Sequence, residues 1–390
     1  MSERLDYLDG LRGLAALAVV FSHFESVFSA AISSGGQYTI TNTLKAYWFL
    51  SGGNFAVCIF FVLSGYVLIL KYDKRGGDAL SSGALKRYLR LTPAILASAI
   101  LLYLIQTSIG FYNSDVAQLI GGHNWLASSQ PPQISFFETI KQGLTVIFHG
   151  QSPQNGVLWT MRIEFLGSMI LFGLCSLFYK SNFYGIISLL FSVFLISYYG
   201  ETGLYVSLFI AGSYILKRKN LYLFWPLIFA ALYLGSFRAW DAPISSISNS
   251  FYWKNFIGIK PDVVIHAVGA IILVLSIRGS EIAKQALSLP VCSWLGRISF
   301  SLYLIHFTVF SSLGCLAIVK LSPLIGVQSA CVVGLSLTLI VTFALSEILT
   351  RTVDLPSQKL ADGFARFFLN RPSAQQSISP KNYRMLDPIQ

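Results

Sequence analysis

Long runs of apolar residues, separated by short polar stretches, make up most of the chain between residues 11 and 349. A helix needs roughly 20 apolar residues to cross the hydrocarbon layer of a membrane. Runs of about this length predict transmembrane helices at 11–32, 48–70, 92–112, 157–179, 183–199, 203–216, 221–237, 262–277, 298–319 and 324–349. The pattern therefore predicts an all-α integral membrane protein with about ten transmembrane helices.

The stretches between these runs predict the domain organisation. The segment 113–156 is rich in Gly, Ser, Pro, Gln and Asn, which is typical of irregular loops. Within it, 136–149 is apolar but contains Glu138 and Lys141, so we expect a re-entrant or interfacial helix, with an eleventh span as the alternative. Residues 1–355 are predicted to form one membrane domain, and 356–390 a cytoplasmic tail that ends in disorder.

Composition supports the membrane interpretation. Apolar residues make up 54% of the chain and charged residues 12%, against roughly 25% charged residues in soluble domains. The mean hydropathy is +0.63. The first apolar run follows Arg4, Asp6 and Asp9 and is longer than the core of a signal peptide, so we expect it to remain as the first span.

The distribution of Lys and Arg predicts the orientation in the membrane. If the N-terminus is cytoplasmic, 21 of the 28 Lys and Arg residues fall in inner segments. Cytoplasmic loops of membrane proteins carry such an excess, so both termini are predicted to be cytoplasmic. The same bias accounts for the net charge of +11, and a nucleic-acid partner is not expected.

His23, Glu164 and His306 are ionisable residues inside predicted spans, where such residues are costly and often functional. His23 is placed near mid-membrane, and the predicted depths of Glu164 and His306 agree with it to within about 10 Å. Arg12 shares a helix face with His23, about 16 Å away. Imidazole suits proton transfer, so a shared polar cavity is one interpretation. Structural hydrogen bonds, a helix-packing ion pair and a snorkelling Arg12 are the alternatives.

A basic cluster precedes the third span. Lys86, Arg87 and Arg90 crowd one side of a short helix, because residues three apart are neighbours on a helix. Arginine forks suit phosphate oxygens. Ordinary positive charge of an inner loop is the alternative interpretation. The five cysteines form no CxxC pair, so no metal site is expected.

Five motifs along the chain resemble those of the acyltransferase-3 family of membrane O-acyltransferases. They are RLDYLDGLRGLAALAVVFSHF with Arg12 and His23, FFVLSGYVL at 60–68, KRYLRLTP at 86–93, LWTMRIEF at 158–165 and ISFSLYLIHF at 298–307. Three features depart from the family: Asp354 stands where a glutamate is usual, Arg162 lies in a stretch that is normally less charged, and the C-terminal hydrolase-like domain of some members is not expected.

The resemblance implies a function and a set of site residues. The expected reaction moves an acyl group, in most members acetyl, from cytoplasmic acyl-CoA to a sugar hydroxyl of a cell-surface polysaccharide or lipid-linked glycan, in a bacterial inner membrane. The implied catalytic residues are Arg12, His23, Glu164 and His306, with His23 as general base or acyl relay. The implied residues for binding acetyl-CoA are Lys86, Arg87 and Arg90.

Two other classes of protein share the apolar pattern. A transporter or flippase could use the same polar residues as a substrate path, although no paired halves with broken helices are visible. A sensor or assembly factor could keep the fold without the chemistry. The acceptor and the choice between direct transfer and a covalent acyl-histidine stay open at the level of sequence.

Overall fold

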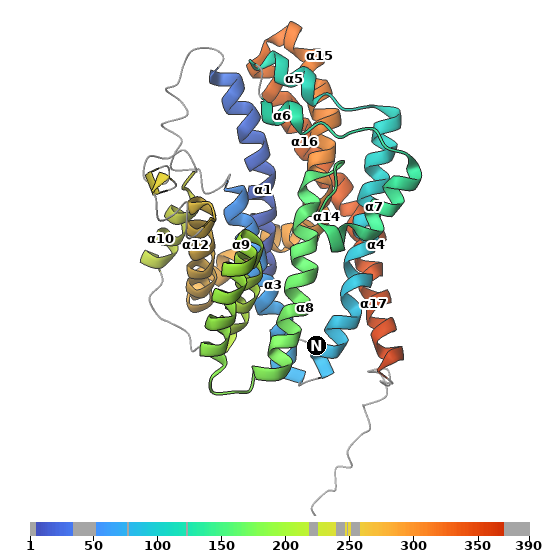
Figure 1. Ribbon diagram of the computed structural model, residues 1–390. Coiled ribbons are helices and arrows are strands. Elements are labelled where there is room, and N and C mark those ends of the chain that lie inside the picture. Colours follow the sequence, from blue (N-terminus) through green and yellow to red (C-terminus); the bar gives the residue numbers. More distant parts are fainter. Residues whose placement is uncertain are drawn as a thin grey trace, which may run out of the picture.

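The computed structural model is a bundle of helices whose long members run roughly side by side (Figure 1). It describes residues 5–33, 52–75, 78–121, 124–217, 225–238, 246–247, 249–250 and 258–369. Within these ranges there are helices and no strands, and seven helices are long and apolar enough to cross a membrane. The chain is therefore an all-α integral membrane protein, as the pattern predicted.

Every predicted span coincides with helical structure. Residues 48–51 and 221–224 of two predicted spans lie outside the described ranges. The first four spans correspond to α1 (Asp6–Ser33), α3 (Gly53–Arg75), α4 (Asp78–Ser108) and the short η2 (Gly156–Leu158) with α8 (Trp159–Phe178). The seventh and eighth correspond to α10 (Trp225–Gly235) and α12 (Pro261–Gly279), and α13 (Glu281–Leu287) follows.

The fifth and sixth predicted spans meet at a sharp kink within α9 (Tyr184–Lys217). Gly200 has φ 55° and ψ −129° there, a backbone conformation that glycine adopts without the steric cost of a Cβ atom. The two arms of α9 fold against each other, because a Cβ added to Gly203 would lie 2.0 Å from the carbonyl oxygen of Leu195. The two predicted spans are therefore two helical arms joined at one residue.

The last two predicted spans are longer than the sequence indicated. The first continues from α14 (Pro290–Val309) through η4 (Phe310–Gly314) into α15 (Cys315–Ile325). The second continues from α16 (Val327–Leu349) through η5 (Thr350–Asp354) into α17 (Leu355–Phe368). Helical structure thus extends past residue 356, where the sequence predicted the tail to begin, and residues 370–390 lie outside the described ranges.

Two features explain why the chain stays helical beyond residue 356. Pro356 comes just after η5, a π-helical stretch of the kind that interrupts an α-helix without ending it. Ser357, Ala361 and Ala365 recur every four residues and are buried, and α17 packs against α4. Small residues at this spacing allow two helices to approach closely.

The polar segment after α4 is more regular than predicted. It contains α5 (Asn113–Leu119), α6 (Asn124–Ser128) and α7 (Phe136–His149). The predicted helix 136–149 is confirmed as a helix: the Ser135 hydroxyl accepts from the backbone N–H of Glu138 at its start, and Gly150, with φ 70°, ends it. The prediction of an irregular loop at α5 and α6 is wrong. These short helices are anchored to the core by buried Val116 and Leu126.

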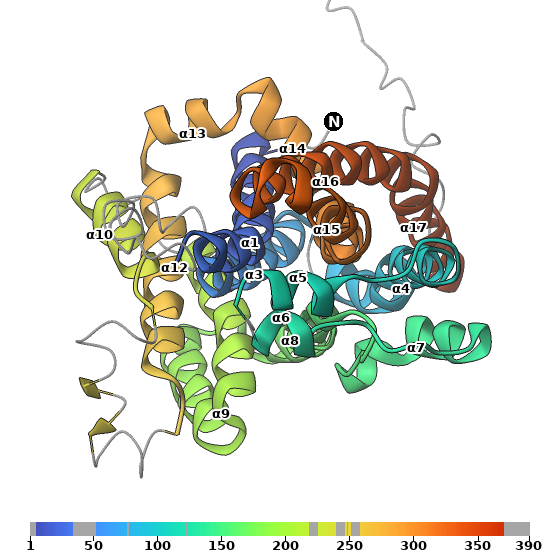
Figure 2. The ribbon, with the colours of Figure 1, turned by 90° about the horizontal axis from the view of Figure 1, so that it is seen from above.

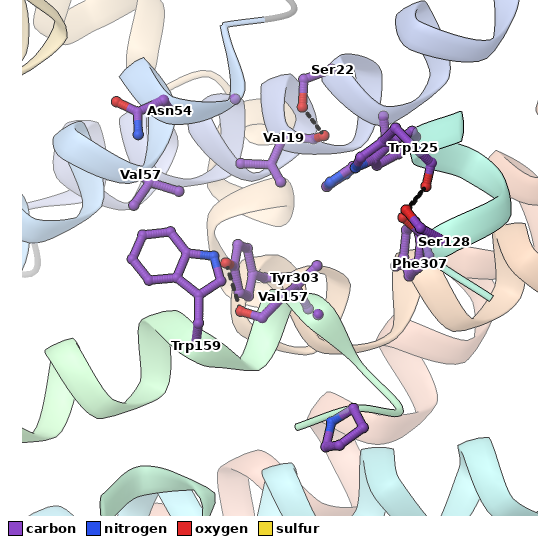
Figure 3. Close-up of a pocket in the computed structure, with 15 residues that line it drawn as sticks. Val19, Ser22, Asn54, Val57, Trp125, Ser128, Val157, Trp159, Tyr303 and Phe307 are labelled. Carbon is purple, nitrogen blue, oxygen red and sulfur yellow. Dashed lines mark hydrogen bonds between the residues drawn. The ribbon is translucent and has the colours of Figure 1, made fainter. Parts of the chain in front are cut away.

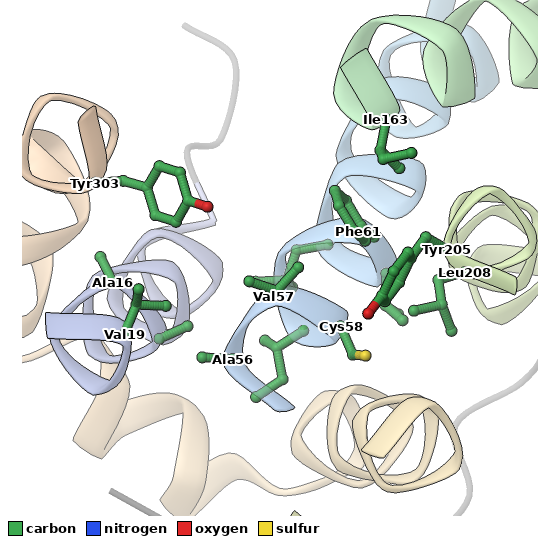
Figure 4. Packing of buried hydrophobic residues seen from close by; sticks show 14 of the residues in the cluster. Ala16, Val19, Ala56, Val57, Cys58, Phe61, Ile163, Tyr205, Leu208 and Tyr303 are labelled. Atoms are coloured by element: carbon green, nitrogen blue, oxygen red, sulfur yellow. The ribbon is translucent and has the colours of Figure 1, made fainter. Parts of the chain in front are cut away.

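Helices α1 and α14 pack in parallel near the middle of the bundle (Figure 2). Gly13 and Gly296 meet at this contact, where a Cβ on Gly13 would lie 2.4 Å from the Gly296 nitrogen. Above this point Ala16 and Val19 of α1 join the buried cluster that contains Val57 of α3 (Figure 4). The close contact fixes the register in which the later turns of α1 and α14 face each other.

The start of α1 and the end of α16 lie at the same end of the bundle. α1 begins beside the start of α14, since a Cβ on Gly10 would lie 3.1 Å from that of Cys292. Near that start, Arg297 of α14 pairs with Glu347 of α16 at 3.2 Å. We refer to this end as the lower end, and to the end with α5 and α6 as the upper end, as in Figure 1.

Candidate active site

A cavity of about 490 Å³ opens between α1, α3, α6, α8 and α14. Its wall mixes aromatic rings, small apolar side chains and a few polar groups, which is typical of ligand pockets. The lining residues are Val19, Ser22, His23, Gly53, Asn54, Val57, Trp125, Ser128, Ser129, Pro153, Gly156, Val157, Trp159, Tyr303 and Phe307. Figure 3 draws all of them and labels ten, with Asn54 and Trp159 at one end and Trp125 and Phe307 at the other.

Two histidines from distant parts of the sequence meet beside this cavity. Nε2 of His306 lies 3.1 Å from Nδ1 of His23, which is hydrogen-bond distance. His306 is completely buried, whereas His23 lines the cavity. The parallel packing of α1 on α14 brings them together, because each lies ten residues beyond one of the glycines in contact, Gly13 and Gly296.

The surroundings of His306 determine which nitrogen of each ring carries the proton. Nδ1 of His306 lies 2.9 Å from the carbonyl oxygen of Tyr303 and 3.2 Å from that of Leu302. A carbonyl only accepts, so this Nδ1 carries a hydrogen. In the neutral pair, Nε2 of His306 is then an acceptor and His23 donates to it from Nδ1. The lone pair of His23 is consequently on Nε2, in the ring that lines the cavity.

Aromatic rings hold the imidazole of His23 in place. The indole of Trp125 stacks on it, with ring centroids 5.8 Å apart and planes inclined by 11°. Phe307 contacts it from a second direction, at 5.4 Å between centroids. Trp125 belongs to α6, so this short upper helix forms one wall around the histidine.

Glu164 belongs to a second cluster, away from the histidines. Its carboxylate pairs with Arg87 and accepts from the Ser64 hydroxyl at 2.9 Å. Nε of Arg87 donates to Ser168 at 2.9 Å, and this arginine is only 5% exposed. Glu164 does not line the cavity. The pair therefore joins α3, α4 and α8 around one carboxylate whose side chain is 15% exposed.

The remaining predicted charges surround this ion pair. Arg90 lies within electrostatic reach of Arg12, Arg87, Glu164 and Asp354. Asp354, from η5, is 5% exposed and accepts from the Gln358 amide at 3.2 Å. We call these five charged residues the arginine cluster. The aspartate that departs from the family motif thus lies among the predicted functional arginines.

Lys86 lies beside this cluster but points to another partner. Its ammonium pairs with Asp362 of α17 at 2.7 Å, and the lysine side chain is partly exposed. Lys86 therefore connects the start of α4 to the last helix that the structure describes.

The predicted site residues thus separate into two groups. His23 and His306 meet at the cavity, as a shared polar cavity requires. Arg12 and Glu164 lie instead in the arginine cluster with Arg87. Arg12 and His23 are eleven residues apart on α1, which is about 16 Å along a helix. Within the described ranges, no group of three His, Cys, Asp or Glu residues could hold a metal ion.

Sequence reasoning missed several residues that shape the cavity. Trp125 lies in the segment that was expected to be irregular, so no periodicity marked it. Asn155 was also missed; its side-chain amide donates to the Leu304 carbonyl at 2.9 Å and fastens the start of η2 to α14. Asn54 carried a usable signal, because an amide at the end of an apolar run is often a hydrogen-bonding residue between helices.

Comparisons with known proteins identify two relatives that are named as acyltransferases. A curated relative from Cochliobolus lunatus, named acyltransferase clz18, is 24% identical over 391 aligned positions, covering 79% of this chain and 83% of its own length. Another, acyltransferase R4 from a Phoma species, is 22% identical with the same coverage of both chains. No solved structure matches the chain.

The family comparison covers most of the chain. Residues 5–347 match the model of the acyltransferase-3 family, which is described as an acyltransferase domain. This range includes the cavity, both histidines and all of the arginine cluster except Asp354. The chain therefore belongs to the acyltransferase-3 family and is an integral membrane acyltransferase.

Proposed function

We propose that this protein is an O-acetyltransferase that moves an acetyl group from cytoplasmic acetyl-CoA to a hydroxyl of a sugar, in a cell-surface polysaccharide or lipid-linked glycan. The observation that carries the proposal is the His23–His306 contact at 3.1 Å beside the cavity of about 490 Å³. This pair supplies a base with a defined lone pair at a place where two substrates can meet. The bacterial inner membrane is not part of the proposal, because the two relatives compared are fungal.

The arginine cluster is the proposed site for the phosphates of acetyl-CoA. Arg12, Arg87 and Arg90 contribute three positive charges, and Glu164 and Asp354 contribute two negative ones, so the cluster has an excess of one positive charge. Arg87 is already paired with Glu164, whereas Arg90 is half-buried and has only longer-range charged neighbours among the described residues. Arg90 is therefore the proposed direct contact to phosphate, with Arg87 holding Glu164 in place. Guanidinium groups suit phosphate oxygens.

Lys86 extends this positive surface toward the lower end. Its ammonium pairs with Asp362 and remains partly exposed. A phosphate that approached along α4 would meet Lys86 before Arg90, which lies one helical turn further in. The lower end is proposed to be the cytoplasmic end, on the basis of the distribution of Lys and Arg.

The proposed chemistry uses Nε2 of His23 as general base. It accepts the proton of the acceptor hydroxyl while the oxygen attacks the thioester carbonyl carbon, so that a C–O bond forms and the C–S bond breaks. The imidazolium then returns its proton to the departing thiolate, which leaves as coenzyme A. His306 keeps the Nδ1 proton of His23 in place, as the orienting partner of a catalytic base does.

The test is thiol release from acetyl-CoA by the protein purified in detergent, with and without His23→Gln. Glutamine keeps a hydrogen bond but cannot accept the proton, so the rate is expected to fall by about 100- to 10,000-fold. Melting temperature and acetyl-CoA binding are expected to stay as in the wild type. Normal thiol release by a folded His23→Gln protein would exclude His23 as the base.

A second measurement addresses the acceptor. Mass spectrometry of surface glycans from cells with and without the protein should reveal an acetyl group that is lost with the protein. A transporter of a glycan would alter the amount of glycan at the surface, but purified transporter would release no thiol from acetyl-CoA. The two assays together separate the enzyme from the transporter.

A further inference from the structure

The end of the cavity away from His23 is formed by a separate set of residues. Asn54 of α3 and Trp159 of α8 lie there, on either side of Val57 in the view of Figure 3. Neither residue belongs to the histidine pair or to the arginine cluster. Ten residues of α3 separate Asn54 from Ser64, the hydroxyl that contacts Glu164, so this end lies about 15 Å above the cluster.

Asn54 is held by partners from two other helices. Its side-chain nitrogen lies 2.6 Å from the hydroxyl of Tyr205, and its oxygen lies 3.2 Å from Nδ1 of His266. His266 is 3% exposed, and its Nε2 lies 3.0 Å from the Phe237 carbonyl, to which it must donate. These contacts fix the plane of the amide.

The amide keeps hydrogen-bonding capacity that these partners do not use. A neutral His266 that donates from Nε2 has a bare Nδ1, which needs the NH₂ end of Asn54; the Tyr205 hydroxyl then donates to the amide oxygen. In the opposite orientation the NH₂ end faces Tyr205 instead. In either orientation Tyr205 or His266 uses one N–H of Asn54, and the other is left with at most the weak contact to Cys58 Sγ at 3.6 Å, on a residue that lines the cavity.

Trp159 provides an apolar surface beside this amide. Its ring contacts Tyr205 at 5.4 Å between centroids, which supports it from behind. The residue is 37% exposed although it lines a cavity within the bundle. A supported indole next to a fixed amide offers an apolar face together with a hydrogen-bond donor. A sugar ring presents the matching pair of C–H faces and hydroxyl oxygens.

We propose that Asn54 and Trp159 form the acceptor subsite, which binds a hydroxylated sugar ring so that one of its hydroxyls reaches His23. Trp159 stacks on the ring and Asn54 donates to a ring substituent, while His266 acts as a positioning residue for Asn54. This assignment rests on the proposed function, and it specifies the place at which the acceptor binds. The phosphates of the donor lie on the other side, in the arginine cluster.

The test compares two reactions of the protein purified in detergent: hydrolysis of acetyl-CoA without acceptor, and acetyl transfer to a panel of methyl glycosides. Asn54→Ala and Trp159→Leu are each expected to raise KM for the best glycoside about tenfold, as the loss of one such contact does. KM for acetyl-CoA, read from the hydrolysis reaction, should stay unchanged, because the phosphates of the donor are proposed to bind in the arginine cluster. His266→Phe should raise the same KM with little effect on kcat.

The matched control is Trp225→Leu, since Trp225 is 44% exposed on α10 and does not line the cavity. It should change none of these values. A rise in KM for acetyl-CoA in Trp159→Leu would overturn the proposal, because this end would then bind the donor. Unchanged KM values for every glycoside in both Asn54→Ala and Trp159→Leu would overturn it too.

A binding measurement covers the cases in which a variant unfolds or the wild type consumes no acetyl-CoA. Titration of the wild type with the glycosides should change its tryptophan fluorescence in a saturable way, and the mild variant Trp159→Phe should lose this change while melting normally. No saturable change in the wild type, or an unaltered change in Trp159→Phe, would reject the acceptor subsite. Saturable binding without acetyl-CoA consumption would instead reject only the proposed function.

Discussion

The arginines of the arginine cluster differ in how much of their positive charge is neutralised by nearby carboxylates. Arg87 donates to Glu164 and Ser168, whereas Arg90 shares Asp354 with Arg12. We therefore propose that the two arginines, three positions apart, serve two purposes. Arg87 is committed to the protein, and Arg90 keeps donors for an anion.

Arg90→Ala is expected to weaken binding of acetyl-CoA to the purified protein. A lost charge-assisted hydrogen bond costs about 1.5–3 kcal/mol, which corresponds to roughly ten- to a hundredfold in Kd. Arg90→Lys should recover part of the affinity, because lysine cannot grip phosphate with two parallel bonds. Displacement of labelled acetyl-CoA measures the effect. The control is Arg351→Ala, a change at a largely exposed arginine outside the cluster, which should leave Kd unchanged. Equal Kd values for all three variants and the wild type would contradict the role of Arg90 in binding phosphate.

Glu164→Gln is expected to destabilise the protein. The change leaves Arg87 buried without its counter-charge, and removal of one partner of a buried pair costs about 3–5 kcal/mol. Thermal unfolding in detergent measures this effect. The matched control is Glu138→Gln, which removes the exposed Lys141–Glu138 pair and should cost less than about 1 kcal/mol. Similar melting temperatures for both variants would show that the Arg87–Glu164 pair is not a buried support.

At the level of elements, the contact between α1 and α14 determines the geometry of the histidine pair. Gly13 and Gly296 allow the two backbones to approach until His23 and His306 are within hydrogen-bond distance further along. The glycines themselves have no chemistry. Their contribution is the closeness and the register of two helices that the sequence separates by more than 250 residues.

Gly13→Ala is expected to reduce both stability and thiol release, although Gly13 lies far from the cavity. The added Cβ would stand 2.4 Å from the Gly296 nitrogen, so α1 and α14 must move apart and the histidine contact must lengthen. Gly173→Ala is the control, because nothing lies within 4 Å of its added Cβ and alanine favours a helix. Melting temperature and acetyl-CoA hydrolysis test both variants. If the Gly13→Ala protein were as active as Gly173→Ala, the close contact between α1 and α14 would not determine the geometry of the histidine pair.

At the level of the whole molecule, the upper and lower ends are expected to face opposite compartments. The excess of Lys and Arg in the predicted inner segments favours a cytoplasmic lower end. Reporter tags inserted after residue 80 and at the C-terminus should both report cytoplasm, and a tag at residue 130 should report the opposite side. Opposite locations for the first two tags would exclude the proposed topology.

Much of this architecture could be predicted because apolar runs identify membrane helices one at a time. The helix over 136–149 was found by the same reasoning, and the residue at the kink, Gly200, falls between two predicted spans. The length of the last helix could not be found in this way. Its continuation past Pro356 depends on small residues packing against α4, and a hydropathy pattern does not show such a contact.

The sequence could predict which residues belong to the site, but not which of them contact one another. Depth along a helix placed His23 and His306 at similar levels, but the rotation and spacing of α1 and α14 decide whether the rings touch. The same reasoning grouped Glu164 with the histidines, whereas its carboxylate pairs with Arg87, 77 residues earlier in the chain. Trp125 had no signal at all, since it lies on a helix of five residues.

The group that orients the histidine pair is a main-chain carbonyl, that of residue 303. In many catalytic dyads a carboxylate side chain fills this position, and a single codon change can abolish it. A peptide carbonyl is present whatever amino acid is encoded at that position. A point mutation at residue 303 therefore leaves the proton arrangement of the histidine pair unchanged. During evolutionary drift, only loss of the helix or of one of the two imidazoles removes it.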